Sequence, residues 1–276
     1  MAFDPAYSGR YITVHLKPLT LKGSSSPGVV DANATDQKVS PKAKQAYEEA
    51  LTSVNAQQFE RAVEMLKRAI DIQPNYFHAY NDLGVLYMRS NQLDQASDAL
   101  RHAIKINNRI YIPQLNLGIV LNRQGKFKEA VEALERIEHS NSELATKINP
   151  PMIEALMGAQ QWTRAEQELR LGLTLKPADA VDLKIKLGLV MIRQGKAGAT
   201  VSILDEACRS EPDNALGQFN FGVALLQVGR LDQAEAVLRL AYQIKGLKWP
   251  ARNSFWEISI FRRRTIRRQW KHSRRT

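Results

Sequence analysis

The sequence has little of what most enzymes and metalloproteins use. Its 276 residues include a single cysteine, Cys208, which excludes a disulfide framework and a cysteine metal cluster. It has no HExxH or CxxC motif and no glycine-rich loop of the kind that cradles phosphates. The five histidines are scattered, and none has another histidine or cysteine at metal-binding spacing. We therefore predict no catalytic residues, no metal site and no cofactor.

Long hydrophobic runs are also missing. No apolar stretch reaches the roughly 18 residues of a membrane-spanning helix, so we predict no transmembrane segment. The first residues do not form a basic-then-apolar signal peptide. We expect a cytoplasmic protein, with an exported protein as the alternative if the true N-terminus is missing. The sequence predicts nothing about the oligomeric state.

The net charge of +11 is unevenly distributed along the chain. Residues 247–276 hold ten Lys or Arg and one Glu, which leaves the rest of the chain close to neutral. A prediction of a nucleic-acid or anionic-surface partner from charge therefore concerns this segment alone.

What the chain does contain is a repeated pattern, clearest in residues 77–110. Small residues and large apolar residues follow one another there at the spacing of two amphipathic helices joined by a short polar turn. Aligned copies begin at Ala43, Phe77, Tyr111, Thr146, Val181 and Ala215, 34 or 35 residues apart. Position 24 is leucine in every copy, and position 8 is Ala or Gly in all but the fourth. A single helix pair cannot bury its apolar face alone, so the copies must stack.

This pattern resembles the tetratricopeptide repeat over about residues 43–246. The resemblance implies an all-α fold, a right-handed superhelical solenoid of helix-turn-helix repeats within residues 40–246. Copy four departs most, because Pro150 and Pro151 fall inside its first helix and Ile153 replaces the small residue. The two prolines predict a late start or a kink in that helix.

The resemblance also implies a concave groove lined by positions 2, 5, 6, 9, 12 and 13 of each first helix. The candidate partner-binding residues at these positions are His78, Asn81, Met88, Arg89, Asn116, Asn122, Arg123, Ile192, Arg193, Phe219, Asn220 and Gln227. Asparagine can bond the N–H and C=O groups of an extended peptide, and arginine can bond a carboxylate through two N–H groups. The same residue types also serve solubility and inter-helix bonding in such repeats, so both roles are open for each.

One feature of some family members is absent. They hold a partner's C-terminal carboxylate with Lys, Asn and Arg from successive first helices. The corresponding positions here are Tyr47, Leu51, Asp82, Ile112 and Asn116. We therefore predict a non-enzymatic scaffold that binds a protein or peptide in the groove, without that carboxylate clamp. The alternative is nucleic-acid or anionic-surface binding through the basic C-terminal segment.

The two ends of the chain do not fit the repeat. Residues 1–22 contain a strand-like run, and residues 23–39 have the composition of a flexible linker. Residues 247–276 combine the basic run with three of the four tryptophans, and three hypotheses cover them. They are an out-of-frame seventh repeat, a capping helix, or a basic binding tail. The first rests on codons: read one frame over, residues 255–257 must give Leu-Gly, 34 residues after Phe221-Gly222.

Overall fold

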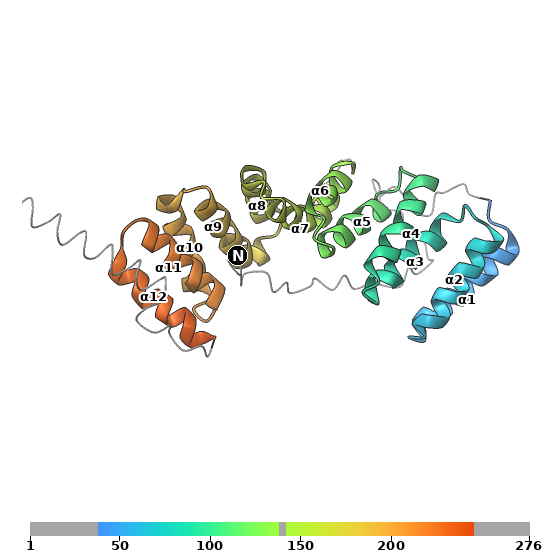
Figure 1. Cartoon of the computed structure of the whole chain (residues 1–276), viewed down its shortest axis with the longest axis horizontal. Helices are drawn as coiled ribbons and strands as arrows, with labels where there is room; N and C mark the ends of the chain where they lie inside the picture. The colour runs from blue at the N-terminus through green and yellow to red at the C-terminus, as the bar shows by residue number, and fades with distance from the viewer. Residues whose placement is uncertain (1–37, 138–141, 246–276) are drawn as a thin grey trace, which may run out of the picture. The chain divides into compact units, whose positions relative to one another are not determined.

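The computed structural model describes residues 38–137 and 142–245 (Figure 1). Within these ranges all regular structure is helical, with twelve α-helices and one short 3₁₀ helix. The prediction of an all-α fold built from helix pairs is confirmed. The strand-like run in residues 1–22, residues 23–37 of the linker and the segment 247–276 lie outside the described residues, and the hypotheses about them stay predictions.

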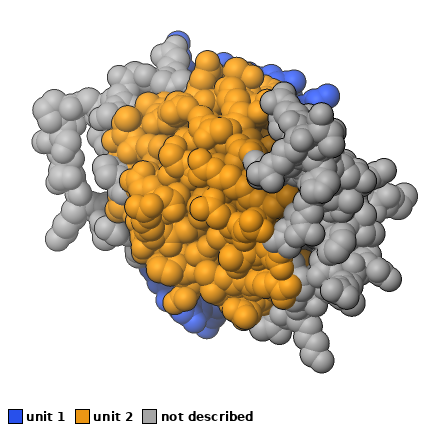
Figure 2. Space-filling view, turned by 90° about the vertical axis from the view of Figure 1, so that its left-hand side faces the viewer, with its two compact units in different colours: residues 1–139 blue, residues 140–276 orange. Residues whose placement is uncertain are grey.

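The chain divides into two compact units, residues 1–139 and 140–276, which are coloured separately in Figure 2. Unit 1 contains α1 (Pro41–Asn55), α2 (Phe59–Ile72), α3 (Phe77–Arg89), α4 (Leu93–Ile106), α5 (Tyr111–Arg123) and α6 (Phe127–Glu135). Unit 2 contains α7 (Ser142–Gly158), α8 (Trp162–Leu175), the 3₁₀ helix η1 (Pro177–Asp179), α9 (Ala180–Arg193), α10 (Ala197–Ser210), α11 (Ala215–Gln227) and α12 (Leu231–Ile244). Within each unit, every α-helix packs against the next one along the chain. We call the odd-numbered helices first helices and the even-numbered ones second helices.

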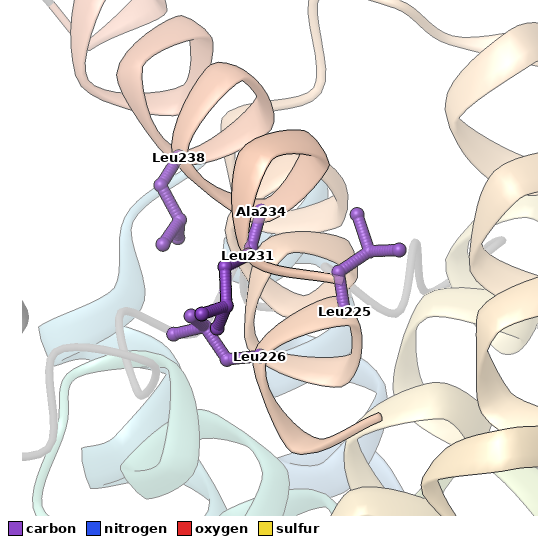
Figure 3. Close-up of a cluster of buried hydrophobic side chains, with 5 residues drawn as sticks. All are labelled: Leu225, Leu226, Leu231, Ala234 and Leu238. Atoms are coloured by element: carbon purple, nitrogen blue, oxygen red, sulfur yellow. The ribbon is translucent and has the colours of Figure 1, made fainter. Parts of the chain in front are cut away.

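The core of each helix pair is a leucine on the second helix. The position-24 leucines are Leu66, Leu100, Leu134, Leu169, Leu204 and Leu238, and each is at most 1% exposed. In four copies this leucine lies directly against a glycine at position 8 of the first helix. Figure 3 shows the last pair, where Leu238 and Ala234 of α12 lie in one buried cluster with Leu225 and Leu226 of α11. Glycine lets the two backbones approach closely enough for the leucine to fill the space between them.

The turn within each pair has the same backbone in all six copies. Its position 15 adopts a left-handed conformation, with φ between 58° and 78°, at Gln57, Asn91, Gly125, Gln160, Gly195 and Gly229. In the last copy the N–H of Gly229 bonds to the carbonyl of Leu226, and the N–H of Arg230 to that of Leu225. This is the Schellman arrangement, which satisfies carbonyls at the end of the first helix.

Of the two outcomes predicted for the first helix of copy four, the late start is wrong, and the kink stays a prediction. Helix α7 begins at Ser142, earlier than any other first helix relative to its copy, and runs through Pro150 and Pro151 to Gly158. The turn before the prolines is held by packing, because Ile148 is buried and Asn149 Nδ2 donates to the backbone carbonyl of Glu168 at 2.8 Å. Gly172 of α8 makes room for this asparagine, since a Cβ there would lie 2.6 Å from Asn149 Oδ1.

The glycine at position 8 leads to the first testable prediction. A Cβ built on Gly222 would lie 2.5 Å from Leu238 Cγ, so Gly222→Ala should destabilise unit 2 by about 1–3 kcal/mol through overpacking. Hydrogen exchange of the α11 and α12 amides measures this local stability. The control is Gly198→Ala in α10, where a Cβ would meet nothing within 4 Å. It should be neutral or stabilising, because alanine favours a helix over glycine. Equal exchange in both variants would show that the α11–α12 pair accommodates the added methyl group without loss of stability.

The left-handed turn residue leads to a second prediction. Gln160 has φ of 58°, a conformation that costs a side-chain-bearing residue roughly 1 kcal/mol and costs glycine almost nothing. Gln160→Gly should therefore raise the free energy of unfolding in urea by about that amount, and Gly229→Ala should lower it. A change of the same sign in both variants would contradict the turn geometry.

Candidate functional site

The first helices of unit 1 are joined by a row of polar contacts. Three of its bonds are Tyr47 Oη to Asp82 Oδ2 at 2.6 Å, Asn116 Nδ2 to Asn81 Oδ1 at 3.5 Å, and Arg123 Nη1 to the Met88 carbonyl at 2.7 Å. In each case the partners are 35 residues apart, so a side chain meets the residue one position earlier in the preceding copy. We call the surface that carries these residues on α1, α3 and α5 the first-helix face of unit 1.

The two arginines predicted for the groove in unit 1 also contact the protein itself. Arg123 bonds the Met88 carbonyl and, through Nη2, Asn91 Oδ1 at 3.0 Å, at the C-terminal end of α3. A cation at that end also suits the helix dipole. Arg89 places its guanidinium carbon 4.3 Å from the centre of the Phe59 ring, a cation–π contact with α2. Through these contacts Arg89 and Arg123 interact with other helices of the protein, which is the inter-helix role that the sequence left open for both.

The other predicted site residues fall into groups by exposure. His78, Asn81, Met88, Asn116 and Phe219 are half-buried, and Arg193 and Gln227 are exposed. Asn122 and Asn220 are each 4% exposed and Ile192 is 9% exposed, so these three offer almost no surface to a partner in this structure. The residues of unit 1 gather on one face, whereas Ile192, Arg193, Phe219, Asn220 and Gln227 belong to unit 2.

Unit 2 does not repeat the polar row. Asn220 is equivalent in its copy to Asn116, but the residue at the preceding acceptor position is Ile185, which has no polar atom. Within the described residues, the buried Nδ2 of Asn220 has no hydrogen-bond partner. The neighbouring first-helix positions are also apolar, with Leu189 and Val223 half-buried there. The first helices of the two units therefore present different chemistry.

A cluster on the first-helix face of unit 1 includes residues that sequence reasoning did not select. The ring centres of Tyr47 and Tyr76 are 5.2 Å apart, and each lies 6.3 Å from the ring of His78. Asp82 lies one helical turn after His78 on α3, accepts the Tyr47 hydroxyl, and accepts Asn81 Nδ2 at 3.0 Å. We call Tyr47, Tyr76, His78 and Asp82 the aromatic–aspartate cluster. The 35-residue spacing between Tyr47 and Asp82 in the sequence could have predicted this cluster.

Burial changes the acid–base behaviour of this cluster. It raises the pKa of Asp82, an effect that the hydrogen bonds from Tyr47 and Asn81 oppose. Burial also lowers the pKa of His78, although the negative charge of Asp82 acts to raise it. Burial, together with the nearby Asp82 and Glu48 charges, raises the pKa of Tyr76 to about 12. Each shift favours the neutral form, because a charge is costly to hold away from water.

Unit 2 has a separate hollow of about 650 Å³ between α10 and α12, with Phe221 and Leu225 of α11 among its lining residues. Two of the charged groups that line it, Arg209 and Asp205, pair with each other. No group of three metal-binding side chains occurs in residues 38–137 or 142–245. Nor do these ranges contain a helix with the length and apolar character needed to cross a bilayer.

Stacked helix pairs joined through their first helices define the class of helical repeat scaffolds. Residues 54–112 match one profile described as a tetratricopeptide repeat, and residues 86–145 and 185–247 match another. Together these matches span more than half of the chain. The chain belongs to the tetratricopeptide repeat family, whose repeats generally form non-catalytic scaffolds for protein–protein interaction.

Solved structures of other repeat proteins share the fold. A tetratricopeptide repeat protein from Parabacteroides merdae has a TM-score of 0.58 at 14% identity, over 84% of this chain and 88% of its own. YrrB, described as a TPR protein with an unusual peptide-binding site, has a TM-score of 0.55 at 19% identity, over 67% and 94%. PilF of Pseudomonas aeruginosa has a TM-score of 0.55 at 14% identity, over 78% and 95%. No curated protein has a matching sequence.

The raised pKa of Asp82 predicts how stability changes with pH. Below the ordinary aspartate pKa of about 3.9, the carboxyl is neutral in both folded and unfolded chains and has no effect. As the pH rises through the higher folded pKa, the folded chain must hold a partly buried charge, and stability is lost. Asp82→Asn has no carboxyl group at this position, so it does not lose stability in this way. Its free energy of unfolding in urea should therefore exceed that of wild type by a margin that grows from about pH 4 toward neutrality.

Tyr47→Phe is the matched variant, because it removes the hydroxyl that bonds the Asp82 carboxylate while keeping the ring. It should cost more stability at neutral pH than at pH 4, since the bond stabilises the charged form. The pKa of His78 depends in part on the Asp82 charge, so the two titrations are linked and the pH-dependent difference reports both groups. A pH-independent difference between wild type and Asp82→Asn would show that the carboxyl is hydrated in the folded chain.

Proposed function

We propose that the chain is a non-catalytic scaffold that binds a peptide segment of a partner protein along the first-helix face of unit 1. The observation that carries this proposal is the pair of half-buried amides Asn81 and Asn116 on adjacent first helices. Among the described residues, no donor bonds Asn116 Oδ1, and the Asn116–Asn81 bond is long at 3.5 Å. The amides of Asn81 and Asn116 can therefore form further hydrogen bonds with a partner.

An extended peptide matches that capacity. Its backbone presents N–H and C=O groups that need partners once they leave water, and an asparagine amide can serve both. Half-buried apolar side chains of α5, Leu115 and Ile119, lie at neighbouring groove positions and would cover the peptide's apolar groups. YrrB, which has a similar fold, is described as having a peptide-binding site. Nucleic-acid or anionic-surface binding through residues 247–276 stays a separate prediction from charge alone.

The test is a selection of displayed random dodecapeptides on the immobilised full chain, followed by affinity measurement of synthetic copies. Asn116→Ala should weaken binding of selected peptides by roughly tenfold, the effect of removing a central polar contact of about 1.4 kcal/mol. The loss of its weak bond to Asn81 should leave the fold intact, which circular dichroism can check.

Arg101→Ala provides the control. Arg101 pairs with Glu129 at 3.1 Å between the second helices α4 and α6, and both side chains are about half exposed. Its removal should leave peptide affinity unchanged, because surface ion pairs contribute little to stability and this one lies on second helices. Peptides whose affinity falls with Arg101→Ala but not with Asn116→Ala would place the site on the second helices and overturn the proposal.

A further inference from the structure

The aromatic–aspartate cluster of unit 1 has the geometry of a corner. The Tyr47 and Tyr76 ring planes are inclined by 49°, those of Tyr47 and His78 by 46°, and those of Tyr76 and His78 by 90°. The three rings are therefore not stacked in one column, and they face different directions. Asp82 is tied to this corner by its 2.6 Å bond from the Tyr47 hydroxyl.

The charge of the cluster is not balanced. The side-chain hydrogen bonds to Asp82 come from neutral donors, the Tyr47 hydroxyl and the Asn81 amide. In the described part of the chain, no lysine or arginine forms a salt bridge with Asp82. Glu48, whose salt bridge to Lys44 is long at 3.8 Å and solvent-exposed, adds a second negative charge close enough to act on Tyr76. Partly buried carboxylates in proteins usually have a cationic partner, and the group that acts on Asp82 here is His78, whose neutral form burial favours.

Aromatic rings that face different directions beside a carboxylate without a Lys or Arg partner favour binding of a cation. Ring faces attract a lysine ammonium or an arginine guanidinium, and the carboxylate adds a charge-assisted hydrogen bond. An anionic ligand would be repelled by Asp82 and Glu48, and an aliphatic ligand would leave the carboxylate without a partner. We infer that the half-buried Tyr47, His78 and Asp82, packed against the buried Tyr76, form a subsite for a Lys or Arg side chain of a peptide bound on the first-helix face of unit 1. The inference rests on the proposed function and names the class of partner, a peptide with a basic residue at one fixed position.

The same peptide selection on the full chain provides the probe. Peptides that bind wild type should be enriched in Lys or Arg at one position, and replacing that residue by norleucine should weaken binding about tenfold. In the Asp82→Asn protein the same norleucine replacement should weaken binding by less than about threefold, because the carboxylate that pairs with the peptide's basic residue is absent. Asp82→Asn keeps the size of the side chain and can still accept the Tyr47 hydroxyl bond, so the fold should persist.

Arg101→Ala is the control, since its ion pair with Glu129 joins the second helices α4 and α6 and lies outside the cluster. The preference for a basic residue should survive in this variant. If Asp82→Asn and Arg101→Ala lose it equally, the preference does not depend on the Asp82 charge, and the subsite is overturned. Selected peptides without Lys or Arg enrichment overturn the subsite alone. Failure to select any peptide overturns the proposed function and the subsite with it.

A direct measurement does not depend on the selection. Titration of the full chain with Nα-acetyl-lysine methylamide should shift the His78 ring signals in the NMR spectrum, and the norleucine analogue should not. In Asp82→Asn the two compounds should give the same response. Equal shifts from both compounds in wild type would show that the cluster does not recognise charge.

Discussion

The contact on which the rest of the structure depends is the packing of one leucine of each second helix against a small residue of the first. Where that residue is glycine, as in Gly84 against Leu100, the helix backbones come close enough for the leucine to be fully buried. Copy four meets the same requirement differently. Ile153 occupies the small position, and the close approach moves to Asn149 against Gly172. The leucine of this copy, Leu169, is still fully buried.

Once each pair has this packing, the turn after the first helix follows. The same left-handed residue and the same two backbone bonds close it in every copy. Within unit 1, first helices of similar length then lie in register, and side chains 35 residues apart meet. The bonds of Tyr47 to Asp82, Asn116 to Asn81 and Arg123 to Met88 all join adjacent copies with this offset. The chemistry of the first-helix face is therefore decided by pairs of positions in adjacent copies.

The two units use the same helix pairs for different surfaces. In unit 1 an asparagine meets an asparagine, and a tyrosine meets an aspartate, so the face is polar and carries an unbalanced negative charge. In unit 2 the equivalent acceptor position is Ile185, and the Asn220 amide is buried without a partner among the described residues. This difference is the reason why the proposed peptide site is placed on unit 1.

The sequence by itself determined the fold class, the helix pairs and the core positions, because these depend on local periodicity and on the size of residues at fixed spacing. It also identified most residues of the first-helix face of unit 1. Only the tertiary structure decided which of them are available. Arg123 bonds a backbone carbonyl of the preceding first helix, and Asn122 is buried, although the sequence pattern treats both as groove residues. Tyr76 and Asp82 follow Tyr47 by about one repeat in the sequence, and the fold brings all three into contact. A contact between residues of different copies leaves no trace in the periodicity of either helix.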